Sequence, residues 1–191
     1  MKGRIGLMCL MAVWVIAVVF VGGALMSYHQ PFQLPSPTIL SLAPKTSSHE
    51  WEAVHVLSGG CACSQRVMRH LLERHPADGI QEQILVVDGE EADLPETGAL
   101  LASLEQEGFP VTHIRIKNVP AGVGLYGLPL LVFASPEKKV TYLGGYGVRG
   151  DQDRQIFEQV RSGGTPKVLA VAGCAVGARL RRKADPLHLK Y

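Results

Sequence analysis

The sequence has few aromatic residues and little net charge, and both shortages exclude kinds of function. Aromatic residues make up 6% of the 191 residues, and the formal net charge is only +2. Proteins that bind nucleic acid without reading its sequence place aromatic side chains along a strongly basic groove, which this composition does not offer. A basic run at residues 179–183 is short, and we interpret it as a solvated surface. We therefore expect no nucleic-acid partner.

Motifs of the common enzyme classes are also missing. The sequence contains no phosphate-binding loop, no dinucleotide-binding glycine pattern and no Ser-His-Asp order of a serine hydrolase. It has no Cys-x-x-Cys pair, so a closed zinc site with four ligands is not indicated. What it does have is four cysteines: Cys9, Cys61, Cys63 and Cys174. Cys9 falls in an apolar segment, and the remaining three are an odd number, unlike a purely structural disulfide framework.

The first 27 residues predict a membrane anchor. Lys2 and Arg4 precede an uncharged apolar stretch from Ile5 to Met26, which is long enough to cross a bilayer as a transmembrane helix. No clear cleavage site follows, so we favour an uncleaved signal anchor over a cleaved signal peptide. The positive charges predict a cytoplasmic N-terminus. Everything after residue 27 would then lie in the periplasm or outside the cell, where disulfide chemistry is possible.

The rest of the chain divides into three parts by composition. Residues 28–49 contain four prolines and several Ser and Thr, which predict an extended linker that holds a domain off the membrane. Residues 50–164 predict the folded domain. Residues 165–191 form a C-terminal extension, in which an apolar strip over 167–173 leads to Cys174. An apolar strip so close to the terminus is expected to dock on the domain, and this docking is one way to bring Cys174 near Cys61.

Hydrophobic periodicity inside residues 50–164 predicts alternating strands and helices. The expected strands are 51–57, 83–87, 111–117, 130–133 and 140–143, and the expected helices are 64–75, 95–107 and 152–161. The last two strands flank a turn-forming segment at 135–139, which is typical of an antiparallel hairpin. Strands that alternate with helices and end in a hairpin predict an α/β fold, with a mixed sheet flanked by helices.

Four features in this order make residues 51–162 resemble the thioredoxin superfamily, and in particular its membrane-tethered periplasmic members. They are a strand and glycine-rich loop that lead to Cys61 and a helix, the segment Gly127-Leu128-Pro129 that resembles the family's cis-proline strand, a hairpin, and a closing helix. An extra helix and strand at about 92–117 is similar to insertions of the tethered members. The resemblance implies a thioredoxin-like fold and is much less specific to an activity.

Two positions depart from the family's pattern. The family motif is Cys-x-x-Cys, whereas this chain has Cys61-Ala62-Cys63-Ser64. If Cys61 takes the nucleophile position, Ser64 takes the resolving position and Cys63 is an extra thiol between them. His55 stands where family members often place a buried acid that moves protons for the thiol. Its imidazole is expected either to act as such a base or to pack against the sheet with a satisfied hydrogen bond.

The position of Cys61 predicts a reactive sulfur. A cysteine at the start of a helix faces unpaired backbone N–H groups and the positive end of the helix dipole, and both favour the nucleophilic thiolate. A cis peptide at Pro129 would bring the backbone of Leu128 beside this sulfur, where a strand edge can pair with a substrate chain. The alternative is an inherited scaffold whose cysteines are inactive.

The partner of Cys61 stays open at the level of sequence. Residues i and i+2 of a helix point to nearly opposite sides, so a Cys61–Cys63 disulfide can close only if residues 60–63 are still loop. Otherwise Cys61 works alone through mixed disulfides, or Cys174 acts as the resolving thiol.

Three functions compete. The first is a thiol-disulfide oxidoreductase without a cofactor, whose partners are protein thiols or disulfides, or a redox partner protein. The second is a module that binds a soft metal such as Cu(I) through Cys61, Cys63 and either Cys174 or His55. The third is a redox-inactive interaction domain.

Overall fold

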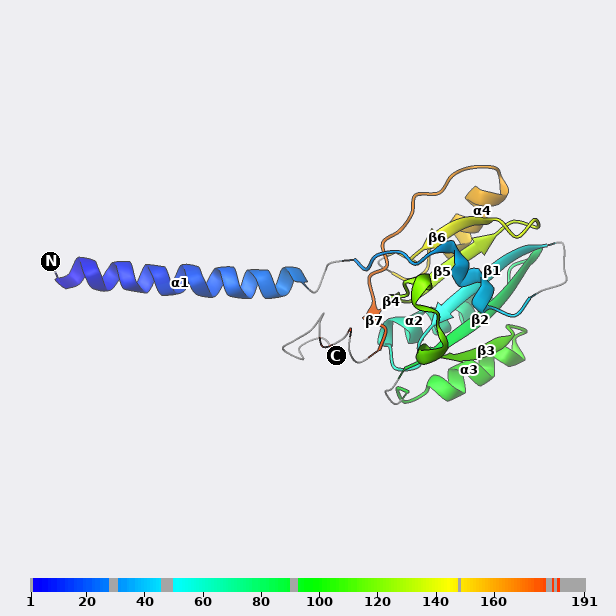
Figure 1. Ribbon diagram of the computed structural model, residues 1–191, viewed down its shortest axis with the longest axis horizontal. Helices are drawn as coiled ribbons and strands as arrows, with labels where there is room; N and C mark the ends of the chain where they lie inside the picture. The colour runs from blue at the N-terminus through cyan, green and yellow to red at the C-terminus, as the bar shows by residue number, and fades with distance from the viewer. Residues whose placement is uncertain are drawn as a thin grey trace.

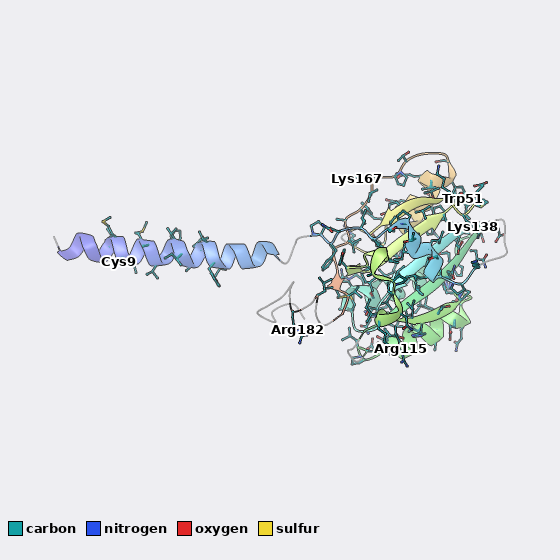
Figure 2. All side chains as sticks on the ribbon, in the orientation of Figure 1. Cys9, Trp51, Arg115, Lys138, Lys167 and Arg182 are labelled. Carbon is teal, nitrogen blue, oxygen red and sulfur yellow. A yellow bond between two sulfur atoms is a disulfide. The ribbon has the colours of Figure 1, made fainter. Side chains whose placement is uncertain are left out.

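The computed structural model describes residues 2–27, 31–45, 50–89, 93–147, 149–177, 180 and 182. Figure 1 shows one long helix that stands away from a domain built of a sheet and helices. The long helix, α1 (Lys2–Ser27), contains a window from Gly6 to Gly23 whose mean hydropathy is 2.4 and of which nothing is buried. By length and composition it can cross a membrane, and a signal sequence would pass the same test. Cys9 is exposed on this helix, away from the domain (Figure 2).

A five-stranded sheet in the order β3-β2-β1-β5-β6 forms the centre of the domain. Its strands are β1 (Trp51–Leu57), β2 (Ile80–Asp88), β3 (Val111–Arg115), β5 (Leu130–Ala134) and β6 (Val140–Gly144). β1, β2 and β3 run parallel, whereas β5 is antiparallel to both β1 and β6. The mixed sheet and the hairpin of β5 and β6 confirm the fold predicted from periodicity.

Helices cover one face of this sheet. They are α2 (Ala62–Arg74), α3 (Thr97–Gln106) and α4 (Asp153–Arg161). Successive side chains of a strand point to opposite faces, so Ala53 and Leu57 of β1 join the core under these helices, while Val54 and Val56 join a second core on the other face. The aromatic ring of Phe133 stacks on Phe157 of α4 with 4.7 Å between the ring centroids.

Two predicted strands differ from the observed ones by two or more residues at one end. The strand expected at 111–117 ends at Arg115, because the chain turns there into the 3₁₀ helix η2 (Ile116–Asn118). The strand expected at 83–87 starts earlier, at Ile80. The residues at its start are mostly polar, but Glu82 and Gln83 are buried. Glu82 lies within hydrogen-bond distance of His55, and Gln83 donates a hydrogen bond to Glu52.

The prediction of an extended linker is wrong for residues 31–45. These residues pack on the second face of the sheet, where the 3₁₀ helix η1 (Pro37–Leu42) buries Ile39 completely. The backbone of Phe32 also forms a bridge with Val171 of the C-terminal extension. The prolines obscured the apolar character of this segment in the sequence. Removing the side chain of Ile39 and its apolar neighbours from water stabilises the packed arrangement over an extended, hydrated chain. The remaining linker positions 28–30 and 46–49 lie outside the described residues.

Residues 165–177 of the C-terminal extension dock on the domain, as the apolar strip predicted. Its residues Cys174–Ala175 form the short strand β7, which pairs antiparallel with β4 (Gly127–Leu128) in a separate two-stranded sheet. Figure 1 shows the described part of this extension leaving α4, passing around the domain and reaching β4. Lys167, which Figure 2 labels, lies on the exposed part of this path.

Candidate functional site

Cys61 lies at the first residue before α2, at the end of a tight loop. Its backbone is extended (φ −127°, ψ 116°), and its carbonyl accepts a hydrogen bond from Gln65 N at 3.0 Å, which opens the helix. Gly59 in the preceding loop accepts hydrogen bonds from Leu94 N and Thr97 Oγ1, each at 3.0 Å. The loop is therefore fixed from two sides, and the fully buried sulfur of Cys61 sits at the positive end of the helix dipole.

Cys61 forms a disulfide with Cys174, 113 residues further along the chain. The two Cα atoms are 5.9 Å apart, inside the usual range for a disulfide. Cys63 is a free, partly exposed thiol. Cys63, in the first turn of α2, is left without a disulfide partner because the sulfur of Cys61 is already bonded to Cys174. Of the pairings that the sequence left open, the structure has the one with Cys174.

The peptide bond between Leu128 and Pro129 is cis, as the resemblance implied. The sulfur of Cys61 lies 3.9 Å from the carbonyl oxygen of Leu128, so the cis-proline strand faces the start of α2. Leu128 is also directly opposite Cys174 in the pairing of β4 with β7. The disulfide therefore joins the helix start to a strand that lies on the cis-proline edge.

Cys63 remains close to this disulfide. The sulfur atoms of Cys61, Cys63 and Cys174 all lie within 4.8 Å of one another. A small hollow of about 30 Å³ borders Cys63 and is lined also by Arg66, Pro129 and Tyr146. This space suits a water molecule rather than an organic cofactor. The site thus consists of one disulfide and one free thiol, whose three sulfur atoms gather at the N-terminus of α2.

Ser64 and His55 have structural partners in this arrangement. Ser64 is buried, and its hydroxyl accepts a hydrogen bond from Ser58 N at 3.1 Å, which fixes the loop before Cys61. His55 is completely buried, with Nδ1 2.5 Å from the Tyr146 hydroxyl and Nε2 2.7 Å from Glu82 Oε2. Both ring nitrogens are therefore engaged away from the sulfurs. Of the two roles considered for His55, these contacts support packing against the sheet.

A buried charged network under α2 was not foreseen. Arg74 donates through Nε to Asp153 at 2.7 Å and through Nη1 to Glu82 at 2.9 Å, with a further very short contact between Nη2 and Glu82. Asp153 also lies 2.8 Å from His70 Nε2. Glu82 precedes the strand expected at 83–87, so the sequence did not indicate that it is buried; inside the observed strand its carboxylate needs a buried cation as partner.

The network sets the protonation of its acids. Burial alone would raise the pKa of Glu82, but hydrogen bonds from His55 and Arg74 outweigh it and lower the pKa to about 2. Burial likewise opposes ionisation of Asp153, yet the hydrogen bond from His70 and the charge of Arg74 lower its pKa to about 2. Both carboxylates are therefore ionised at neutral pH, and α2, which carries Cys61 at its start, is tied to the sheet at its other end.

Comparisons with known proteins give similarity of fold. No family model and no curated protein matches this sequence. A hypothetical protein from Sinorhizobium meliloti is 17% identical, with a TM-score of 0.53 over 78% of this chain and 91% of that one. An uncharacterised conserved protein from Geobacillus kaustophilus is 16% identical, with a TM-score of 0.48 over 78% and 89% of the two chains. A thioredoxin-like protein from Aeropyrum pernix is 13% identical, with a TM-score of 0.39 over 78% and 99%.

Proposed function

We propose that this chain, whose fold is thioredoxin-like, is a thiol-disulfide oxidoreductase that reacts with protein thiols or disulfides, or with a redox partner protein, through Cys61 and Cys174. The observation that carries the proposal is the Cys61–Cys174 disulfide at the N-terminus of α2, beside the cis peptide of Pro129. Because the bond joins Cys61 to a residue 113 positions away, we assign the role of resolving thiol to Cys174 rather than to a neighbour in the motif.

The geometry supports reduction of a substrate disulfide in two exchange steps. In the reduced chain the helix N-terminus favours the thiolate of Cys61, which attacks one sulfur of the substrate disulfide and releases the other as a thiolate. Cys174, as thiolate, then attacks the Cys61 sulfur of this mixed disulfide and releases the second substrate sulfur. The substrate gains two electrons, and the Cys61–Cys174 disulfide is formed.

Burial supports a route by which a dithiol reductant restores the thiols. Cys61 is fully buried in the disulfide, whereas Cys174 is partly exposed. An incoming thiolate therefore reaches the Cys174 sulfur first, and the electrons of the broken bond go to Cys61. This direction is also favoured chemically, because a thiol of low pKa is the better leaving group. The second thiolate of the reductant then attacks the reductant sulfur that is bonded to Cys174. The reductant leaves as a disulfide, and Cys174 is released as a thiolate.

A disulfide-reduction assay on an insulin-like protein substrate tests the proposal. We expect the Cys61→Ser variant to lose activity, and the Cys174→Ser variant to accumulate a mixed disulfide on Cys61. The matched control is Cys63→Ser, which removes a nearby thiol outside the disulfide and is expected to retain most of the activity. Activity of Cys61→Ser at the level of the unaltered chain would refute the proposal.

The location of the domain is part of the same proposal. We place the N-terminus in the cytoplasm and the domain in the periplasm or outside the cell, held by α1. The apolar window of α1, the basic residues before it in the sequence and the presence of a disulfide support this topology. A thiol reagent that cannot cross membranes should label Cys63 in cells whose inner membrane is intact. Labelling of Cys63 only after lysis of that membrane would contradict the topology.

The three neighbouring sulfurs favour a second candidate, a Cu(I) site in the reduced chain. Thiolates are the ligands that a soft ion prefers, and those of Cys61, Cys63 and Cys174 lie close enough to share one ion. Cys174 serves as third ligand here in place of His55, because the ring nitrogens of His55 are held by Tyr146 and Glu82. Anaerobic titration with Cu(I) should give one tightly bound ion, and Cys63→Ser should weaken binding at least about tenfold. Equal Cu(I) binding by the oxidised chain would exclude this site.

A further inference from the structure

The C-terminal extension occupies the edge of β4 in the manner of a bound peptide. Leu128 of β4 is directly opposite Cys174, and the pairing continues to Val176, whose N–H donates to the carbonyl of Tyr126 at 3.0 Å. On the other side of the extension, Phe32 N donates to the carbonyl of Val171 at 3.0 Å. Backbone hydrogen bonds to two other segments therefore hold residues 171–176, whose only strand is β7 and whose cysteine is bonded to Cys61.

The residue before this cysteine has to be glycine. A Cβ atom on Gly173 would overlap the carbonyl oxygen of Leu128 and would lie 2.8 Å from Cδ of Pro129. Glycine is required here because the backbones of Gly173 and Leu128 approach closely. The atoms that a Cβ would meet belong mainly to the main chain, which cannot move aside as a flexible side chain can. Any chain that takes the same position, with its cysteine opposite Leu128, meets the same carbonyl oxygen.

The other inward positions of the segment accept only modest side chains. Val171 and Ala175 are each 1% exposed, and Gly173 is buried between them, whereas Ala172 is exposed. The alternation places one face of the segment, which includes the strand β7, against the domain. The position after the cysteine is thus restricted to a small residue, and the position two before it is open to solvent.

We infer that residues 171–176 are an internal occupant of the edge of β4, and that a substrate segment can replace them there only if glycine precedes its reactive cysteine and a small residue follows it. The inference rests on the proposed function. It adds the class of substrate segment, and it names residues 171–176 as a segment that competes with the substrate for the edge of β4. A substrate segment that pairs with β4 has to displace the extension of this chain first. Strand pairing supplies affinity to any sequence, and the close contact at Gly173 supplies selectivity.

The test uses the full-length chain with Cys61 as its single cysteine, in which Cys9, Cys63 and Cys174 are replaced by serine. The probe is the peptide Val-Ala-Gly-Cys-Ala-Val, activated as a mixed disulfide with 2-thiopyridine. The Cys61 thiolate attacks the peptide sulfur, the bond between that sulfur and the thiopyridine breaks, and 2-thiopyridone leaves with the electron pair. Its absorbance gives the rate. No other oxidant or reductant is needed.

Three further activated probes separate the effect of the glycine, the effect of strand pairing and the intrinsic reactivity of Cys61. A peptide with valine in place of glycine should react at least about tenfold more slowly, because the added side chain meets the Leu128 carbonyl. A peptide with proline in the last position should also be slower, since it lacks the N–H that Val176 donates to Tyr126. A small activated disulfide, hydroxyethyl thiopyridyl disulfide, reports the reactivity of Cys61 without any strand pairing.

A second variant tests whether the extension is the occupant. Gly173→Val in the same single-cysteine chain should expel the extension and increase the rate with the glycine peptide several-fold. The matched control is Gly122→Val, where a Cβ has open space around it. Circular dichroism and a thermal melt show whether each variant is folded, and the Gly122→Val chain should keep the rate of its parent.

The outcomes separate this inference from the proposed function. Equal rates for the glycine and valine peptides, or an unchanged rate in the folded Gly173→Val chain, would overturn the inference while Cys61 still reacts with the small disulfide. Failure of Cys61 to react with any of the probes would instead refute the proposed function. A dimer of the unaltered chain in which Cys174 of one copy is bonded to Cys61 of the other would mean that the edge accepts a second copy, and it too would overturn the inference.

Discussion

Arg74 donates through Nε to Asp153 over 2.7 Å and so joins the last turn of α2 to the first turn of α4, 79 residues later in the chain. The same guanidinium bonds Glu82 of β2, and its side chain is only 6% exposed. Burial lowers the pKa of Arg74, but the bonds and charges of Glu82 and Asp153 more than offset this and raise it. The guanidinium of Arg74 thus links α2, which begins next to Cys61, to α4 and to β2.

Replacing Arg74 with methionine should strongly destabilise the domain. Two buried carboxylates would lose their cation, and breaking a buried ion pair from one side costs about 3–5 kcal/mol. The measurement is urea unfolding followed by circular dichroism. Arg69→Met is the matched control on the same helix, because the Arg69–Glu96 pair is exposed and such pairs contribute about 0–1 kcal/mol. Similar losses in the two variants would contradict this role of Arg74.

The same acids predict how stability depends on pH. In the unfolded chain Glu82 and Asp153 have the ordinary pKa values 4.5 and 3.8, and folding lowers both to about 2. Because the folded pKa values are depressed, the stabilisation is complete above pH 4.5 and is lost as the pH falls towards 2. Urea unfolding between pH 6 and pH 2 should show this loss. Glu82→Gln should flatten the profile, and an unchanged slope in that variant would argue against the assignment.

Loss of the disulfide should lower stability through the unfolded state. The bond closes a loop of 113 residues, for which the chain-entropy model gives at most about 5 kcal/mol. Cys174→Ala should therefore unfold at a lower urea concentration than the unaltered chain, and a dithiol reductant should bring the two curves close together. Cys63→Ala leaves the disulfide in place and serves as control. If reductant shifts Cys174→Ala as much as the unaltered chain, the stabilisation does not come from this bond.

Ile39 should behave as a core residue although it lies between prolines. Its side chain is completely buried against the second face of the sheet, so Ile39→Ala should cost about 2–5 kcal/mol. Leu34→Ala removes an apolar side chain that is 41% exposed in the same segment, and surface changes of this kind usually stay within about 0.5 kcal/mol. Equal, small effects of both substitutions in thermal or urea unfolding would mean that residues 31–45 are a tether after all.

The sequence allowed much of the central fold to be predicted, because its signals there are local. A strand, a glycine-rich loop and an amphipathic helix follow one another around Cys61, and each depends on a few neighbouring residues. The cis-proline segment and the hairpin after it are likewise short patterns. The apolar helix α1 was equally plain from composition.

The charged network and the packing of residues 31–45 were beyond such patterns. Glu82 and Asp153 are far apart in the chain, and only the folded sheet and helices bring them to the same guanidinium. In residues 31–45 the prolines interrupt the regular spacing of apolar residues by which a helix or strand with an apolar face is recognised. Ile39 is nevertheless completely buried, like the residues of the core. His55 had two open roles in the sequence because its partners, Tyr146 and Glu82, come from distant segments.

The sequence by itself determined that one sulfur stands at the start of a helix, since the glycine-rich loop and the helix periodicity around Cys61 are local. Only the tertiary structure decided that its partner is Cys174 and that Cys63 is left free. The physical reason is that a disulfide needs Cα atoms within a narrow range of distance, and over 113 residues this distance depends on where the extension docks. That docking depends on the edge of β4 and on Gly173, whose close approach to Leu128 no sequence pattern reveals.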